Sequence, residues 1–337
     1  MSNKLNLCLL FGGKSGEHEV SLQSAKSIFN ALDKTKYEIS LIGIDKNGNW
    51  LLNQSSEFLL NDTNPKLIAL NKSNSIPVAT TANNNKTDII NIQTGVKIKT
   101  VDVVFPIIHG TYGEDGSLQG LLEIMDIAYV GANVLGSAIG MDKDVMKRLL
   151  NYANIPTSKF YVLRNTDNIQ EEIKKILQIM ELPLFIKPAN AGSSVGVSKA
   201  HNSDEVLKGI QDAFRYDEKI LVEEFIDGRE IECSILGNDE PIASIPGEVN
   251  PTHEFYSYEA KYIDENGASV SIPAQLNATL VKQIQDLAIK TFKVLECSGM
   301  ARVDMFLTKE GKLYINEINT LPGFTKISMY PKLWEAS

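Results

Sequence analysis

Four polar side chains near the C-terminal end of the 337-residue chain have the types and spacing of a metal site: Arg302, Asp304, Glu317 and Asn319. They lie in two apolar runs separated by a Thr-Lys-Glu-Gly-Lys stretch, which is typical of a hairpin turn. With 310–311 as the two loop residues, Asp304 lies opposite Glu317, and the other two residues form the next pair on the same face. Two carboxylates and an amide oxygen are hard ligands that suit Mg²⁺ bound together with substrate phosphates. Because facing carboxylates destabilise a sheet unless a cation lies between them, a metal site is favoured over an ordinary charged strand pair.

A loop of small residues at 187–197 follows a short apolar strand and has the composition of a phosphate-binding segment. Its Gly and Ser residues allow backbone N–H groups to approach phosphate oxygens, and Lys187 at its start supplies positive charge. The loop runs into another extended stretch, so we interpret it as a hairpin lid rather than a strand-to-helix P-loop. Lys143, at the start of a predicted helix, is a second candidate for phosphate binding. A plain flexible hairpin and a lysine on a helix surface are the alternatives.

Carboxylates alternate with apolar residues where two further strands meet, in a segment that contains Glu223, Phe225, Ile226 and Glu230. An adenine ring needs apolar faces and an acceptor for its amino group, and a ribose needs acceptors for its hydroxyl groups. This segment offers both, although charged strand edges would have the same composition.

Two glycine-rich turns in the N-terminal part each follow an apolar run, and they carry Glu17 and His109. The first is not a Walker A loop, because the position five residues before its Gly-Lys-Ser at 13–15 is Cys8 rather than glycine. It also lacks the Gly-x-Gly-x-x-Gly spacing of a dinucleotide site. Both turns should lie at the carboxyl edge of a parallel sheet, where α/β proteins bind ligands, and Glu17 can hold an ammonium group there. The alternatives are an acidic helix N-terminus for Glu17 and a buried polar residue for His109.

The elements that must position these residues fall into three predicted domains. Residues 5–44 have the pattern strand, glycine turn, helix and strand, so 1–141 is predicted to be a Rossmann-like α/β domain whose parallel sheet is covered on both faces. Residues 46–100 are polar with short apolar islands, which we interpret as an elaborated edge of that domain. A compact α+β unit at 142–228 and a strand-rich unit with one long helix at 229–337 follow.

The composition indicates a soluble protein that acts on small molecules. The chain has 33 Lys and Arg against 42 Asp and Glu, a formal net charge of −9, which argues against nucleic acid or an anionic membrane as the main partner. No apolar run reaches the roughly 18 residues of a membrane span, and the N-terminal run is too short for a secretory signal. Three widely spaced cysteines form neither a disulfide framework nor a zinc pattern. We therefore expect a cytoplasmic protein with no membrane or nucleic-acid partner.

Taken in order along the chain, these motifs resemble the ATP-grasp superfamily, and most closely its D-alanine–D-alanine ligase family. The segments that carry the resemblance are FGGKSGEHEVS at 11–21, HGTYGEDGSLQG at 109–120, MDKDVMK at 141–147, FIKPANAGSSVGV at 185–197, EEFIDGREIECSILG at 223–237, YSYEAKY at 256–262, ARVDMFL at 301–307 and INEINTLPGFT at 315–325. The resemblance implies an ATP-grasp fold, mixed α/β and α+β, preceded by a Rossmann-like domain. It also implies that ATP phosphorylates the carboxylate of one D-alanine, and that the amine of a second D-alanine attacks the resulting acyl phosphate.

The resemblance further implies which residues handle the amino acids: Glu17, Ser193, Tyr262, His109, Arg302, Gly323 and Ser328. Glu17, linked through hydrogen bonds to Ser193 and Tyr262, would hold the first ammonium group. His109 would lie nearby. Arg302 and the Gly323 backbone would stabilise the tetrahedral oxyanion, and Ser328 would bind the carboxylate of the second substrate.

A second implied group binds Mg-ATP: Lys143, Lys187, Lys261, Glu223, Phe225, Ile226, Glu230, Asp304, Glu317 and Asn319. The three lysines would contact the phosphates, with Lys261 on a lid at 256–262. The carboxylates at 223 and 230 would contact adenine and ribose, with the two apolar residues beside the ring. The last three residues of the group would hold two Mg²⁺ ions, for which Mn²⁺ would substitute.

The lid sequence Glu-Ala-Lys-Tyr at 259–262 favours an amine nucleophile, since family members that make D-alanyl-D-lactate usually depart from it. A ligase with D-lactate or D-serine as its second substrate is the alternative. A non-catalytic amino-acid binder and a nucleotide-dependent dehydrogenase are less favoured, because the metal-binding set is intact and the dinucleotide fingerprint is absent. The family role implies a homodimer that serves peptidoglycan precursor synthesis. In the family a further helix follows the segment that matches 330–334, whereas this sequence stops at Ser337.

Overall fold

The computed structural model describes residues 4–53, 57–251 and 268–337, which divide into two compact units. Unit 1 contains residues 1–137, 298–300 and 320–331, and unit 2 contains 138–297, 301–319 and 332–337. The three cysteines, Cys8, Cys233 and Cys297, are buried free thiols. None of the described helices combines the length and the apolar character needed to cross a membrane. The finer division into three domains stays a prediction.

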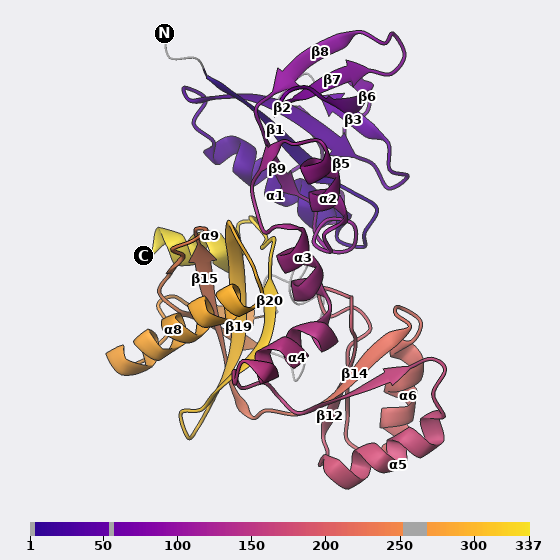
Figure 1. Ribbon diagram of the computed structural model, residues 1–337, viewed down its shortest axis with the longest axis vertical. Coiled ribbons are helices and arrows are strands. Elements are labelled where there is room, and N and C mark those ends of the chain that lie inside the picture. Colours follow the sequence, from indigo (N-terminus) through magenta and orange to yellow (C-terminus); the bar gives the residue numbers. More distant parts are fainter. Residues whose placement is uncertain (1–3, 54–56, 252–267) are drawn as a thin grey trace. The chain divides into compact units, whose positions relative to one another are not determined.

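The centre of unit 1 is a mixed sheet (Figure 1). Its strands are β1 Leu5–Gly12, β2 Tyr37–Ile44, β3 Trp50–Asn53, β6 Ser75–Ala82, β7 Thr87–Asn91, β8 Lys97–Val101, β9 Val103–Ile107 and β10 Ala128–Tyr129, in the order β10-β9-β1-β2-β3-β6-β7-β8. Strands β10, β9, β1 and β2 are parallel, and from β3 onward the pairing is antiparallel. A small pair, β4 Leu59–Leu60 and β5 Ala69–Leu70, interrupts this extension in the sequence. The polar stretch at 46–100 therefore does elaborate the edge of a parallel sheet, as predicted.

Both faces of the parallel strands are covered. Alternate residues of β1 point to opposite faces of a sheet, and Leu9 packs in one cluster with Leu22 of α1 (His18–Ala31). Leu10 belongs to a different cluster, which includes Leu118 of α2 (Ser117–Ile124). Burial on both sides explains why β1 is an unbroken apolar run, and it confirms the predicted parallel sheet with helices on both faces.

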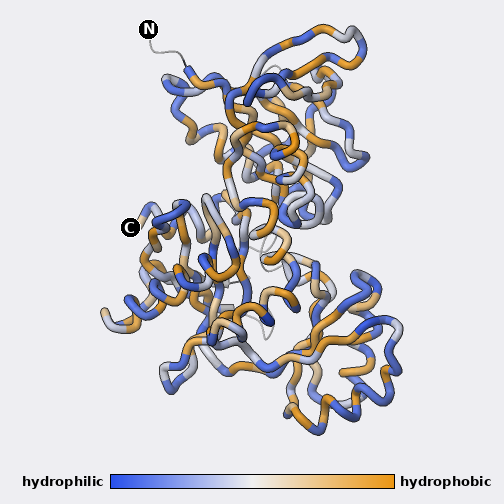
Figure 2. The backbone as a smooth tube through the Cα atoms, in the orientation of Figure 1, coloured by the Kyte–Doolittle hydropathy of each residue, from blue (hydrophilic) through white to orange (hydrophobic). Residues whose placement is uncertain are grey.

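Unit 2 begins with a small antiparallel sheet that lies beside two helices (Figure 1). Its elements are α3 Val134–Met141, which begins before the unit boundary, α4 Lys143–Tyr152, β11 Phe160–Arg164, α5 Ile169–Ile179, β12 Leu184–Pro188, β13 Ser198–Ala200, α6 Ser203–Ala213 and β14 Lys219–Glu224. The strand order is β11-β14-β12-β13. Along α5 and α6, hydrophobic and hydrophilic residues alternate (Figure 2). The buried residues Ile176 of α5 and Ile210 of α6 pack in one cluster with Ile186 and Val222 of the sheet.

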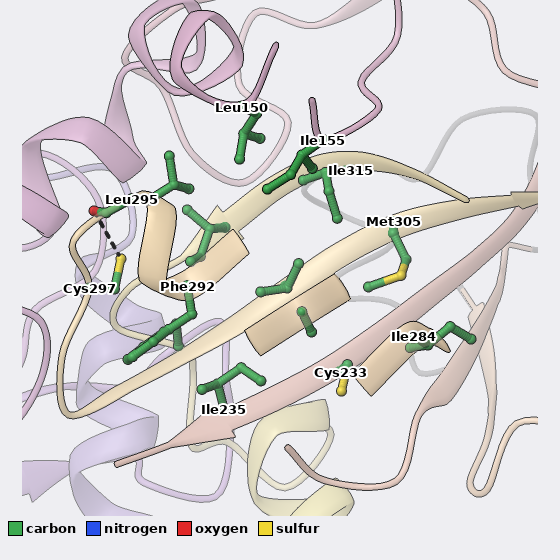
Figure 3. Close-up of a cluster of buried hydrophobic side chains, with 14 of the residues drawn as sticks. Leu150, Ile155, Cys233, Ile235, Ile284, Phe292, Leu295, Cys297, Met305 and Ile315 are labelled. Atoms are coloured by element: carbon green, nitrogen blue, oxygen red, sulfur yellow. Dashed lines mark hydrogen bonds between the residues drawn. The ribbon is translucent and has the colours of Figure 1, made fainter. Parts of the chain in front are cut away.

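The second sheet of unit 2 carries the predicted metal site. Its region contains β15 Gly228–Leu236, β16 Ile242–Ala243, β17 Gly247–Pro251, β18 Ala268–Ser271, α8 Ala278–Val294, β19 Met300–Thr308, β20 Leu313–Asn319 and α9 Met329–Glu335. The first residue of β19 and the first three residues of α9 are assigned to unit 1. The strand order is β18-β17-β15-β19-β20, with β16 paired to β15. Phe292 of α8 and Leu150 of α4 pack with Met305 and Ile315 of the two last strands (Figure 3). Helix α4 therefore shares a hydrophobic core with the hairpin that carries the predicted metal site.

Candidate functional site

The hairpin of β19 and β20 has the register that the sequence predicts at its polar end. Asp304 pairs with Glu317, and Arg302 pairs with Asn319. The predicted two-residue loop at 310–311 is wrong, because Thr308 N–H donates to the carbonyl of Lys312 across a three-residue loop. The register shifts by one residue between Asp304 and Met305, where β20 has an extra residue. This bulge compensates for the longer loop, so the four polar residues still meet in the expected pairs.

Arg302 supplies the positive charge on this face. Its guanidinium donates to both carboxylate oxygens of Asp304, from Nε at 2.7 Å and from Nη2 at 2.6 Å. The same Nε lies 2.8 Å from Oε2 of Glu232 on β15. In the described parts of the chain, no group of three or more His, Cys, Asp or Glu side chains has the geometry of a metal site. The expected set therefore depends on the Asn319 amide as its third ligand, and such an oxygen set has the chemistry that Mg²⁺ takes.

The N-terminus of α4 fixes Lys143 next to the small-residue loop. Asp142 caps this helix by accepting a hydrogen bond from the backbone N–H of Val145 at 3.1 Å. Lys219 of β14 donates to the same carboxylate, at 2.7 Å from Oδ1. Lys143 donates through its backbone N–H to the carbonyl of Ala189 at 3.0 Å, and through Nζ to the carbonyl of Ala191 at 2.8 Å. The lysine and the loop are therefore held together by two hydrogen bonds.

Lys143 also connects the loop with the metal-site hairpin, since its Nζ lies 3.8 Å from Oε2 of Glu317. Lys187 makes the corresponding link from the start of the loop, 3.4 Å from Oδ1 of Asn316. In the loop itself Ser193 and Ser194 have φ of 50° and 61°, the left-handed region that side chains rarely adopt. Both predicted phosphate lysines and the loop are thus brought to the same hairpin within unit 2.

The predicted adenine segment begins with a buried carboxylate. Glu223 on β14 accepts from Ser158 Oγ at 3.0 Å and pairs with Lys187 Nζ at 2.9 Å, both through Oε2. Burial acts to raise the pKa of the Glu223 carboxyl, but the ammonium groups of Lys147 and Lys187 outweigh it and hold the pKa below its usual range. The carboxylate is therefore ionised.

Beyond Glu223, the chain presents apolar surface. Phe225 is 40% exposed, which is unusual for a phenylalanine, and its ring lies 6.1 Å from that of Phe185. Lys199 Nζ lies 4.4 Å from the centre of the Phe225 ring, a cation–π contact that the sequence did not reveal. Ile226 follows in the connection to β15, and Glu230 lies on β15 opposite Val249. An exposed aromatic ring beside a buried acceptor is the combination that an adenine needs.

In unit 1, the two glycine-rich turns meet as predicted. Ser15 Oγ donates to the carbonyl of His109 at 2.6 Å, and the backbone N–H of Glu17 donates to the same hydroxyl at 3.2 Å. Gly110 has φ of 75°, and a Cβ there would lie 2.7 Å from Oε2 of Glu17. A side chain at this φ would be strained and would displace the Glu17 carboxylate, so glycine at position 110 lets the second turn lie against that carboxylate.

His109 is engaged at both ring nitrogens. Nδ1 lies 3.1 Å from the carbonyl of Leu321, and Nε2 lies 3.1 Å from Ser24 Oγ, which in turn accepts from the backbone N–H of Phe324 at 3.1 Å. A carbonyl only accepts, so Nδ1 carries the proton and Nε2 accepts from Ser24. Burial lowers the pKa of His109 to about 4, against a smaller opposite effect of the bond to Leu321. His109 is therefore neutral and holds the 321–324 segment; Ser24, which the sequence did not single out, completes the arrangement.

The two remaining predicted residues of unit 1 are Gly323, in this segment, and Ser328, which follows it. Ser328 Oγ accepts from the backbone N–H of Thr325 at 2.9 Å, and a Cβ on Gly323 would lie 2.8 Å from the same oxygen. Gly323 and Ser328 are therefore neighbours in one turn. Lys261 and Tyr262, with the rest of the predicted lid, lie outside the described residues. The predicted link between Glu17 and Ser193 joins the two units and stays a prediction.

The comparisons with known proteins agree along the chain. Family models described as D-ala D-ala ligase N-terminus and C-terminus match residues 6–132 and 149–337. A curated D-alanine–D-alanine ligase of Oceanobacillus iheyensis is 55% identical over 334 residues, which is 99% of this chain and 91% of that protein.

Two solved structures have the same fold over almost their full length. The D-alanine–D-alanine ligase from Coxiella burnetii has a TM-score of 0.86 and 41% identity, covering 100% of this chain and 90% of its own. The VanG D-Ala:D-Ser ligase from Enterococcus faecalis has a TM-score of 0.86 and 37% identity, covering 99% of this chain and 95% of its own. With both family models and a full-length relative in agreement, this chain belongs to the D-alanine–D-alanine ligase family.

Proposed function

We propose that this ATP-dependent ligase joins two molecules of D-alanine into D-alanyl-D-alanine and releases ADP and phosphate. A carboxylate is a poor acyl donor, so a carboxylate oxygen of the first D-alanine first attacks the γ-phosphorus and ADP leaves. The amine of the second D-alanine then attacks the acyl carbon, loses a proton and expels phosphate, which retains one oxygen of the original carboxylate. Family membership supports this reaction, and the proposed peptidoglycan precursor role follows from its product.

The observation that carries the proposal is the arrangement of β19 and β20 within a chain of this family. Asp304 and Glu317 face each other in register, with Arg302 bound to Asp304. Together with Asn319, the carboxylates of Asp304 and Glu317 would hold two Mg²⁺ ions, or Mn²⁺ in their place, and these ions would neutralise charge on the triphosphate. Arg302 would stabilise the oxyanion that forms when the amine attacks.

For the nucleotide, Lys143 and Lys187 would contact phosphate oxygens: Lys143 is bonded to the small-residue loop at Ala191, and Lys187 begins that loop. Glu223 would accept from the adenine amino group, with Phe225 and Ile226 beside the ring and Glu230 at the ribose. Lys261 on the lid would approach the γ-phosphate.

For the amino acids, Glu17 would hold the first ammonium group, with Ser193 and Tyr262 linked to it. The Gly323 backbone would donate to the oxyanion, and Ser328 would bind the second carboxylate. Because both nitrogens of His109 are engaged, we propose that it serves the site by holding the 321–324 segment. We also propose that the protein is a cytoplasmic homodimer with no membrane partner.

An isotope experiment tests the acyl phosphate directly. D-alanine labelled with ¹⁸O in its carboxylate is incubated with Mg-ATP and the enzyme, and the released phosphate is analysed by mass spectrometry. One ¹⁸O atom per phosphate is expected, because the carboxylate oxygen stays with phosphorus. Unlabelled phosphate formed together with dipeptide would contradict the mechanism. Parallel reactions with added D-serine or D-lactate identify the second substrate, and we expect the D-alanyl-D-alanine mass to predominate.

A further inference from the structure

Lys147 of α4 is an ammonium group with no exposed surface, and the proposed function does not use it. Its Nζ donates to Ser158 Oγ at 2.8 Å and lies 3.3 Å from Oε2 of Glu223. Burial lowers the pKa of Lys147 to about 8, against the opposing attraction of Glu223. Burying a lysine is costly unless it is paired and hydrogen-bonded. A buried position for this residue therefore calls for a specific reason.

The pairing of Glu223 is strongly asymmetric. Its Oε2 is approached by three donors, Ser158 at 3.0 Å, Lys187 at 2.9 Å and Lys147 at 3.3 Å. Its Oε1 is also buried, yet no hydrogen-bond donor reaches it from the described residues. A buried acceptor without a partner costs free energy comparable to a lost hydrogen bond. An arrangement that saturates one oxygen and leaves the other without a donor suits a carboxylate that receives its last donor from a ligand.

We propose that Lys147 is a positioning residue for recognition of the nucleotide base. With Ser158 it fixes the Glu223 carboxylate so that Oε1 remains available to the exocyclic 6-amino group of adenine. The inference rests on the proposed role of Glu223 at the base and adds the residue that orients it. A purine without the 6-amino group leaves Oε1 unpaired, and a 6-oxo purine brings an acceptor against it. Preference for ATP over such nucleotides therefore depends on Lys147.

The two lysines of α4, Lys143 and Lys147, make different contacts, which supports different roles for them in nucleotide binding. Lys143 lies one turn before Lys147 on the same helix, and its Nζ is bound to the small-residue loop through Ala191. Lys147 instead points to β14 and to Ser158. One helix face thus supports both ends of the nucleotide, with the phosphate end held by Lys143 and the base end by Lys147.

The test compares nucleotide preference in three variants. Lys147→Met removes the ammonium at similar length, Lys147→Gln restores a donor, and Lys175→Met is the control for an exposed lysine that pairs with Glu172 on α5. For each, kcat/KM is measured with ATP, with purine riboside triphosphate and with ITP. A hydrogen bond to a charged group predicts a wild-type preference for ATP over the purine analogue of roughly 10- to 150-fold.

We expect Lys147→Met to reduce this preference to within about threefold, through a raised KM for ATP, with kcat at saturating ATP and KM for D-alanine little changed. Lys147→Gln should recover part of the preference, and Lys175→Met should keep all of it. An unchanged preference in Lys147→Met would overturn the proposal. If that variant does not fold, the proposal is tested by the same ratio of kcat/KM values, ATP over the purine analogue, in Ser158→Ala. This variant removes the hydroxyl that is hydrogen-bonded to both Lys147 and Oε2 of Glu223.

Failure of the underlying function has a different signature. Wild-type protein that binds ATP but forms no dipeptide from D-alanine would contradict the proposed reaction, and the nucleotide preference would then be measured by equilibrium binding. Wild-type protein that makes dipeptide equally well from ATP and the purine analogue would contradict the role of Glu223, and with it that of Lys147.

Discussion

His109 should take up a proton only near pH 4, and this should destabilise unit 1 in acid. The folded-state pKa is about 4, whereas the ordinary value is 6.5. Between these two pH values the unfolded chain binds a proton that the folded chain excludes, so stability is complete above pH 6.5 and falls as the pH falls. The gap corresponds to about 3 kcal/mol in full, and to about 2 kcal/mol at pH 5. Because His109 is buried, little of this is lost to solvent screening.

The assay compares unfolding of the wild-type protein and His109→Gln at pH values from 7.5 to 4. All other titrating groups are shared, so the pH dependence of the difference in unfolding free energy isolates His109. The wild-type advantage should shrink by about 2 kcal/mol between pH 7 and pH 5. His201→Gln, which replaces an exposed histidine, is measured in parallel as the control for loss of a histidine side chain.

Histidine resonances in NMR spectra of ¹³C-labelled protein give the pKa directly, with the His109 signal assigned by its loss in His109→Gln. A signal that titrates near 6.5, or an advantage over His109→Gln that stays constant from pH 7 to pH 4, would refute the assignment of His109 as a neutral, doubly bonded ring.

Three substitutions test other parts of the site. Ser24→Ala removes the partner of both His109 and the Phe324 N–H; it should cost roughly 1–3 kcal/mol in thermal unfolding and raise the KM for the second D-alanine, and an unchanged KM would show that the 321–324 segment does not need this support. Glu17→Gln should raise the KM for the first D-alanine by roughly 10- to 150-fold while leaving the KM for ATP nearly constant. A change confined to the KM for ATP would contradict the role of Glu17 at the first ammonium group. Glu317→Gln should raise the Mg²⁺ concentration for half-maximal turnover by roughly tenfold or more, and an unaltered Mg²⁺ titration would remove this carboxylate from the metal site.

Much of the fold follows from local patterns. The unbroken apolar run of β1, its glycine turn and the periodic pattern of α1 predict a parallel strand covered on both faces, and the two clusters around Leu9 and Leu10 confirm it. The pairing of Asp304 with Glu317 was predicted correctly from a loop that was one residue too short. A bulge cannot be seen in an apolar pattern, because it changes which residues pair without changing their composition.

Lys147 and Ser24 show what sequence patterns leave out. A helical lysine is usually at the surface, and nothing in composition tells that this one faces a buried carboxylate. The helical spacing does indicate burial of Lys147, because this residue lies four residues after Lys143 and three before the core residue Leu150, on the buried face of α4. Ser24 has no such signal, because its two partners come from loops far away in the sequence. Contacts of that kind depend on tertiary packing and not on local spacing.

The most direct test of the proposed function is phosphate release from Mg-ATP in the presence of D-alanine, L-alanine or no amino acid, with the product identified by mass. We expect release only with D-alanine, with one dipeptide formed for each phosphate. Release that does not depend on D-alanine, or folded protein that binds ATP but yields no dipeptide, would contradict the assignment of this chain as a ligase of two D-alanines.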